Sequence, residues 1–133
     1  MVAAHSKMGA VLYARDLGRV ARFYASVLGL QPGETDEEHV ILEAPGFQLV
    51  VLRIPERIAA SIVIATPPRR RDNVAIKPVF FVSSIAATRG AVEAGGGVMN
   101  PPTKEWSFQG VTVCDALDPE GNVLQFRAPA APE

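Results

Sequence analysis

Residues 16–30, DLGRVARFYASVLGL, carry the clearest structural signal in the chain. Asp16 is a preferred N-cap residue, and the apolar residues after it recur at the three- and four-residue spacing of a helix with one buried face. Gly29 stands where helices often end in the left-handed conformation that glycine adopts readily. The stretch therefore predicts a helix over residues 17–28, preceded by a short apolar strand over residues 8–14.

Further alternating and apolar runs predict strands on both sides of a second helix. After the first helix we expect strands over residues 30–34, 39–44 and 47–54, the last two joined by a turn at Pro45-Gly46. Beyond them we expect a strand over residues 75–82, a helix of about ten residues capped by Ser84, and strands over residues 110–116 and 122–127.

The two halves are in register with each other. Asp16 and Gly29 in the first half are separated by the same interval as Ser84 and Gly97 in the second. Gly46 and Gly121 stand in equivalent turns, each before the last strand of its half. This spacing predicts an internal repeat of two βαβββ units. We expect a single domain over residues 1–133, with module one at about 8–54, a connector at 55–74 and module two at about 75–127.

The connector breaks regular structure. It contains Pro67-Pro68 and the run Arg69–Arg71, and its residues 61–65 could add a strand. The arginine run is expected to be solvated, with a contact to an acidic partner as the alternative.

Composition narrows the class of protein. The 133 residues are 48% hydrophobic and 20% charged, with a formal net charge of −1, which indicates a folded globular domain and disfavours a nucleic-acid partner. No apolar run reaches the roughly 18 residues of a membrane span, and the first residues lack a signal-peptide pattern. Cys114 is the single cysteine and is expected to be a buried, inert thiol. We therefore expect a cytoplasmic protein.

Two groups of residues resemble a known family. The first is Asp16-Leu17, Phe23-Tyr24 and Leu28-Gly29-Leu30, and the second is residues 118–122, DPEGN, before a strand. Together they resemble the vicinal oxygen chelate superfamily, which includes glyoxalase I, bleomycin-resistance proteins, fosfomycin-resistance enzymes and extradiol dioxygenases. The resemblance implies an α+β fold in which two tandem βαβββ modules form an eight-stranded, U-shaped half barrel, commonly completed in a homodimer.

Metal-dependent members of that superfamily carry His, Glu or Gln ligands on four strands. Matching the shared motifs places these positions at Gly9, Val50, Lys77 and Gln125. Glycine and valine offer no ligand atom, and a lysine ammonium repels a divalent ion. A shift of one residue in either direction brings in no carboxylate, imidazole or amide.

His5 and His39, the only histidines, fall outside these positions. We therefore expect no metal and no other cofactor, because a catalytic metal usually has about three protein ligands. The metal-dependent chemistry of glyoxalase I and the dioxygenases is not expected, and a metal-dependent lyase or dioxygenase is the alternative if the positions are misassigned.

Strand alternation places several side chains on the same faces as those four positions. The candidate ligand-binding residues are Lys77, Gln125, Gln48, Tyr13, Phe81, Trp106 and Arg127. Lys77 could hold an anionic oxygen of a ligand, or it could pair with an acid such as Glu43 or Glu105. Trp106 could form an aromatic wall over a flat ligand, or it could anchor its loop.

Three functions stay open at this point. The first is a metal-free protein that binds a small organic molecule, anionic or aromatic, without converting it. The second is a metal-independent lyase or isomerase in which Lys77 or an acid transfers a proton. The third is a structural or regulatory dimer. The expected partners are a small molecule and a second copy of the chain, with no nucleic acid and no membrane.

Overall fold

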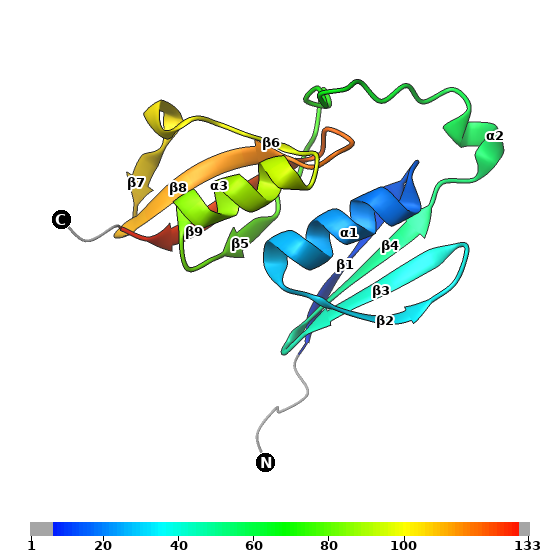
Figure 1. The fold of residues 1–133 in the computed structure, drawn as a ribbon, viewed down its shortest axis with the longest axis horizontal. Helices are drawn as coiled ribbons and strands as arrows, with labels where there is room; N and C mark the ends of the chain where they lie inside the picture. Colours follow the sequence, from blue (N-terminus) through cyan, green and yellow to red (C-terminus); the bar gives the residue numbers. More distant parts are fainter. Residues whose placement is uncertain (1–6, 131–133) are drawn as a thin grey trace, which may run out of the picture. The chain divides into compact units, whose positions relative to one another are not determined.

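The computed structural model describes residues 7–130, in which nine strands and four helical segments form two compact units that divide after Val63 (Figure 1). His5 lies outside the described residues. The α+β class predicted from the sequence is confirmed. No helix between residues 7 and 130 has both the length and the apolar character needed to cross a membrane.

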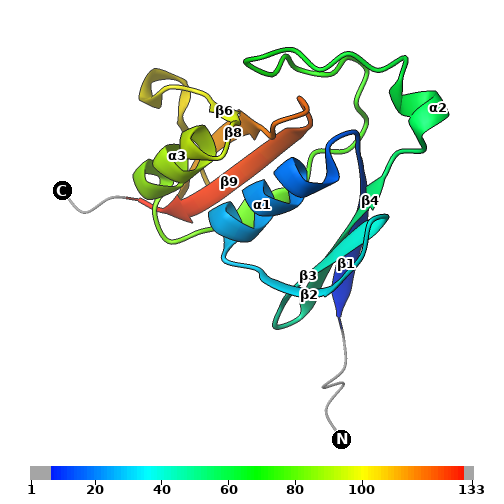
Figure 2. The same ribbon diagram turned by 45° about the vertical axis from the view of Figure 1, so that its right-hand side comes forward.

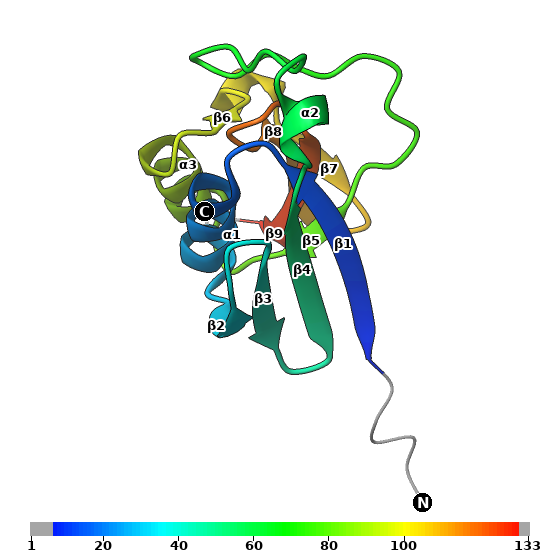
Figure 3. The ribbon, with the colours of Figure 1, turned by 90° about the vertical axis from the view of Figure 1, so that its right-hand side faces the viewer.

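The first unit is a four-stranded sheet with one helix packed on it. Figure 3 shows its strands side by side in the order β1-β4-β3-β2, with β1 and β4 parallel and the other neighbours antiparallel. The elements are β1 (Met8–Ala14), α1 (Leu17–Leu28), β2 (Gln31–Thr35), β3 (His39–Ala44), β4 (Phe47–Arg53) and the short α2 (Glu56–Ala59).

Helix α1 begins and ends where the sequence predicts. The Asp16 side chain accepts a hydrogen bond from the backbone N–H of Arg19 at 3.1 Å, and Gly29 ends the helix with φ of 67°. The buried side of the helix, which includes Phe23 and Tyr24, packs against β3 and β4. Burial of this apolar stripe is the main source of its stability.

The second unit repeats this arrangement. Its strands follow the order β5-β9-β8-β6, and β7 also pairs with β8. Helix α3 packs against β6, β8 and β9 (Figure 2). The elements are β5 (Val79–Phe81), α3 (Ile85–Ala94), β6 (Val98–Met99), the 3₁₀ turn η1 (Pro102–Lys104), β7 (Trp106–Phe108), β8 (Val111–Leu117) and β9 (Val123–Pro129).

Strand pairing confirms the internal repeat. Val11 pairs with Val50 in the first sheet, and Val79 pairs with Gln125 in the second, both in parallel ladders. In the register of the two sequence halves, Val79 is the counterpart of Val11 and Gln125 is the counterpart of Val50. The capping is repeated as well, because Ser84 accepts from the Ala87 N–H at 3.1 Å at the start of α3.

Four strand predictions need correction. The sequence predicts no strand directly after the second helix, but Val98–Met99 form the short strand β6 by pairing with β8. Strand β5 spans only Val79–Phe81 instead of residues 75–82, because Pro78 has no N–H to donate to a ladder. Residues 61–65 form no strand. The sequence predicts a loop at residues 104–108, but Trp106–Phe108 form β7 by pairing with β8.

The DPEGN turn joins β8 to β9 and is buried. Asp118 organises it by accepting hydrogen bonds from the N–H groups of Glu120 at 2.8 Å and Asn122 at 3.1 Å. Gly121 has φ of 83°, and a Cβ there would lie 2.0 Å from the Arg69 carbonyl oxygen. Arg71 also packs on the turn, because its Nε donates to the Glu120 carbonyl at 3.0 Å. The arginine run is therefore only partly solvated, because its first and last residues contact the turn.

Candidate functional site

The second sheet has one face under α3 and one face turned away from it. Cys114 and Phe126 are fully buried on the α3 side. Their strand neighbours point the other way because side chains alternate along a strand. We call this second face the open face; it carries Val79, Phe81, Trp106, Phe108, Val113, Asp115, Gln125 and Arg127, with Lys77 beside it.

A chain of polar side chains crosses the open face. The Lys77 ammonium lies 2.9 Å from Asp115 Oδ2. Gln125 donates from Nε2 to Asp115 Oδ1 at 3.1 Å and accepts from Arg127 Nε at Oε1, at 2.9 Å. Only one orientation of the Gln125 amide lets it donate to Asp115 and accept from Arg127 at the same time. The hydrogen bonds therefore run from Lys77 through Asp115 and Gln125 to Arg127.

Aromatic side chains surround the Arg127 end of this chain. The Arg127 guanidinium carbon lies 4.9 Å from the ring centroid of Phe108 and 5.9 Å from that of Phe81, both within cation–π range. Phe81 is 73% exposed, Phe108 45% and Trp106 42%. A gathered patch of exposed aromatic surface is typical of a binding site.

The structure therefore brings together five of the seven predicted ligand-binding residues: Lys77, Phe81, Trp106, Gln125 and Arg127. Tyr13 and Gln48 belong to the corresponding face of the first sheet. Tyr13 is 60% exposed. Gln48 donates to Glu43 Oε1 at 2.8 Å, and its amide together with the Lys7 ammonium holds the pKa of Glu43 below its ordinary value.

Two chemically important residues of the open face, the acid Asp115 and the aromatic Phe108, are not among the predicted ligand-binding residues. Asp115 pairs directly with Gln125 in the ladder of β8 and β9, and alternation along β8 turns its side chain toward the open face. Phe108 was missed because its segment is predicted to be a loop. The predicted alternatives for the acid beside Lys77 have other partners in the structure, since Glu43 bonds Lys7 and Glu105 bonds Arg89.

The positions where the superfamily places metal ligands do not suit a divalent ion. A Cβ at Gly9 would lie 2.8 Å from the Gln48 carbonyl oxygen, so a longer side chain there would need the backbone to move. Val50 has no lone pair, and the ligand oxygen of Gln125 already accepts from a cation. Between residues 7 and 130, no group of three or more His, Cys, Asp and Glu side chains is arranged to hold an ion.

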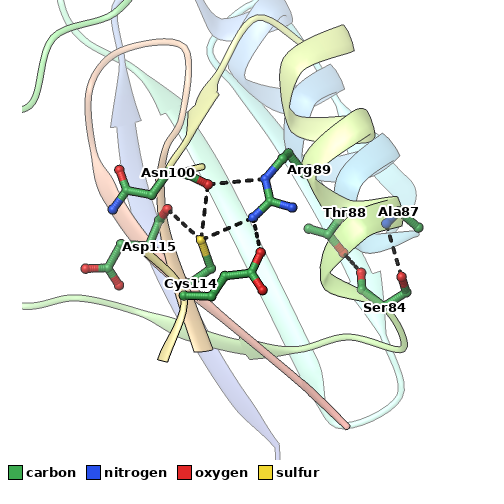
Figure 4. Close-up of polar contacts among 8 residues, drawn as sticks. Ser84, Ala87, Thr88, Arg89, Asn100, Cys114 and Asp115 are labelled. Atoms are coloured by element: carbon green, nitrogen blue, oxygen red, sulfur yellow. Dashed lines mark hydrogen bonds and ion pairs between the residues drawn. The ribbon is translucent and has the colours of Figure 1, made fainter. Parts of the chain in front are cut away.

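Cys114 lies on the α3 side of the sheet, beside Arg89 and Asn100 (Figure 4). Its sulfur is 3.4 Å from the Asn100 carbonyl oxygen and 3.7 Å from Arg89 Nη2. Burial raises the pKa of the Cys114 thiol above its ordinary value, although the nearby guanidinium opposes this. The thiol is therefore protonated at neutral pH and is a poor nucleophile.

Known structures share this fold. A glyoxalase/bleomycin resistance protein/dioxygenase family enzyme from Burkholderia phytofirmans PsJN superposes with a TM-score of 0.69 at 15% identity, over 92% of this chain and 97% of its own. The fosfomycin resistance protein FosX from Listeria monocytogenes superposes with a TM-score of 0.63 at 15% identity, over 98% and 96%. A glyoxalase/bleomycin resistance protein from Albidiferax ferrireducens T118 gives 0.64 at 19% identity, over 93% and 98%.

Sequence comparison agrees at the level of the family. No curated protein matches the chain significantly. The family model described as a glyoxalase-like domain matches residues 9–126, which covers both repeats from β1 to β9. The chain therefore belongs to the glyoxalase-like domain family of the vicinal oxygen chelate superfamily.

Proposed function

We propose that this protein binds a small anionic organic molecule with an aromatic part on the open face, without a metal and without converting it. The observation that carries the proposal is the placement of Arg127, held by Gln125 on one side and by the rings of Phe81 and Phe108 on the other. This arrangement joins a positive charge to exposed aromatic surface.

The charge of the face favours an anion. Lys77 and Arg127 contribute two positive charges and Asp115 one negative charge, which leaves a net charge of +1. A carboxylate or phosphonate on the ligand would form charge-assisted hydrogen bonds with either cation. Phe81, Trp106 and Phe108 would then stack against a planar group.

Binding without conversion is favoured by the way the groups pair. Both oxygens of Asp115 already accept hydrogen bonds, one from Lys77 and one from Gln125, so a proton from a bound molecule would have to compete with these two contacts. The buried Cys114 thiol lies on the opposite side of the sheet and is protonated. Sequestration is also the activity that the resemblance to bleomycin-resistance proteins implies, and one structural neighbour is named a glyoxalase/bleomycin resistance protein.

A thermal-shift screen tests the proposal. Purified protein is screened against aromatic carboxylates, thiol conjugates and antibiotics, and each hit is followed by calorimetry and by analysis of the compound after incubation. We expect stabilisation by aromatic anions, stoichiometric binding, and recovery of the compound unchanged. Consumption of the compound would instead support the metal-independent lyase or isomerase.

Elemental analysis of protein purified without added metal is the second measurement. We expect no stoichiometric zinc, nickel, manganese or iron. An equivalent of any of these ions would overturn the metal-free proposal, and it would show that the ligand positions had been misassigned.

The expected homodimer and the cytoplasmic location also stay predictions. Light scattering coupled to size-exclusion chromatography measures the first directly. A mass equal to that of one chain across the micromolar range would contradict it.

A further inference from the structure

A separate cavity of about 490 Å³ lies on the α3 side of the second sheet. Its walls include Ser84 and Ala86 from the start of α3, Thr112 from β8, and Pro102 and Pro129. Thr112 points to the same face as Cys114, whereas Asp115 points to the other face. The cavity and the open face are thus on opposite sides of one sheet.

Arg89 lines this cavity and keeps part of its donor capacity unused. Its Nε donates to the Asn100 carbonyl at 3.2 Å, and its Nη2 contacts Glu105 and Cys114 (Figure 4). The other terminal nitrogen, Nη1, donates to no side chain or carbonyl among residues 7–130. A guanidinium has five N–H donors, so its two Nη1 hydrogens are available to a ligand.

Glu105 lines the same cavity and keeps an acceptor unused. Its Oε2 is bound to Arg89, and its Oε1 accepts from no group within the described part of the chain. The side chains of Arg89 and Glu105 are only 16% and 23% exposed. Partial burial strengthens the electrostatic interactions that both groups can still make.

We propose that this cavity binds a small zwitterion, of the α-amino acid class with an apolar side chain. Its carboxylate would accept from Arg89 Nη1, and its ammonium would donate to Glu105 Oε1. A simple anion would be repelled by Glu105, and a simple cation by Arg89. The volume lies within the roughly 300–1,000 Å³ of small-molecule pockets, and Pro102 and Pro129 supply apolar surface for the side chain.

Three probes of similar size test the charge requirement. L-Leucine carries both groups, 4-methylpentanoate lacks the ammonium, and isopentylamine lacks the carboxylate. In NMR titrations of the full chain we expect saturable shifts with L-leucine around the start of α3, and at least tenfold weaker binding of either analogue. Equal binding of an analogue, or no saturable binding of any probe at millimolar concentration, would overturn the proposal.

Two variants on one helical turn test the location. Ala86 lines the cavity and Ala87 does not, and both are exposed. Ala86→Phe should block L-leucine, whereas Ala87→Phe should bind it as the unmodified protein does. Unchanged binding by Ala86→Phe would refute the site, even if Arg89→Gln or Glu105→Gln proves too unstable to measure. Lys77→Met, on the opposite face, should leave L-leucine binding intact, which separates this test from that of the proposed function.

Discussion

Lys77 stands just before β5, where its side chain is 38% exposed beside Asp115. Lys77→Met should weaken an aromatic anion found in the screen at least tenfold, or about 1.4 kcal/mol, because a charge-assisted hydrogen bond is lost. Calorimetry with the same compound measures the change. The matched control is Lys104→Met, which removes the same charge from η1. Equal losses in both variants would indicate long-range charge and not a contact.

Gly121 allows a separate test of the backbone. Gly121→Ala should lower the free energy of unfolding by more than about 1 kcal/mol, because φ is 83° and the new Cβ would meet the Arg69 carbonyl. Gly90→Ala is the control, since no atom lies within 4 Å of a Cβ there and the residue is inside α3. It should stabilise the protein by roughly 0.5–1 kcal/mol. Urea denaturation measures both, and a Gly121→Ala variant as stable as the parent would contradict the contact.

At the scale of single residues, side-chain identity and strand alternation predict which residues share the open face. They do not predict the hydrogen bonds and ion pairs between those residues. Gln125 and Arg127 share a face because they alternate with Phe126 on one strand. The partner of Lys77 could not be predicted, because Asp115 lies 38 residues away and only the pairing of β8 with β9 brings it into reach.

At the scale of elements, the N-caps of α1 and α3 should contribute similar amounts to the free energy of unfolding. Asp16→Ala and Ser84→Ala should each cost about 1 kcal/mol, because each leaves a backbone N–H of the first helical turn without its acceptor. Asp72→Ala, at an exposed position outside every helix and strand, serves as the control. Urea denaturation followed by circular dichroism reports the result. A loss at Asp72 as large as at Asp16 would show that charge, and not capping, is responsible.

Helices were predictable because their signals are local. The cap, the apolar stripe and the terminal glycine of α1 all lie within residues 16–30. The bounds of β5 and the existence of β6 and β7 were not predictable, because such short strands are defined only by pairing with a partner strand. Trp106–Phe108 forms a strand because the edge of β8 supplies backbone hydrogen-bonding partners. The sequence of the segment itself does not predict that pairing.

At the scale of the whole molecule, acid should destabilise the fold through specific carboxylates. Hydrogen bonds from the backbone N–H groups of Glu38 and His39 hold the pKa of Asp36 below its ordinary value, and the pKa of Glu43 is lowered in the same sense. Such groups stabilise the folded state above the ordinary carboxyl pKa near 4, and this stabilisation is lost as the pH falls through their lowered values.

The urea midpoint should therefore fall at acidic pH, and Glu43→Gln should flatten that fall. Glu93→Gln, at an exposed position of α3, should leave the pH profile as it is in the parent. A parent profile that is flat below pH 4 would show that these bonds do not stabilise the folded state.

Cys114 reports on the opening of the second unit. Its thiol is fully buried, so a thiol reagent should label it rapidly only in urea concentrations that unfold the protein. The labelling rate should follow the unfolding curve measured by circular dichroism. Fast labelling without denaturant would mean that this part of the sheet opens readily in the native state.

The duplicated topology could be predicted from spacing alone, because the register of the two sequence halves recurs in the strand ladders. The polar pairing on the second sheet could not, because the two sheets share one strand order but carry different side chains at equivalent positions. Position 50 is a valine, whereas its counterpart is Gln125.

The close approach at Gly9 limits how this scaffold could be redesigned. Installing an imidazole there to recruit a transition metal would first require a different β4 backbone, since the carbonyl of Gln48 occupies the space that the new side chain's first carbon would need. Directed evolution toward a metalloenzyme would therefore have to move the backbone of a strand before this position could supply a ligand, so a single substitution at Gly9 would not be enough.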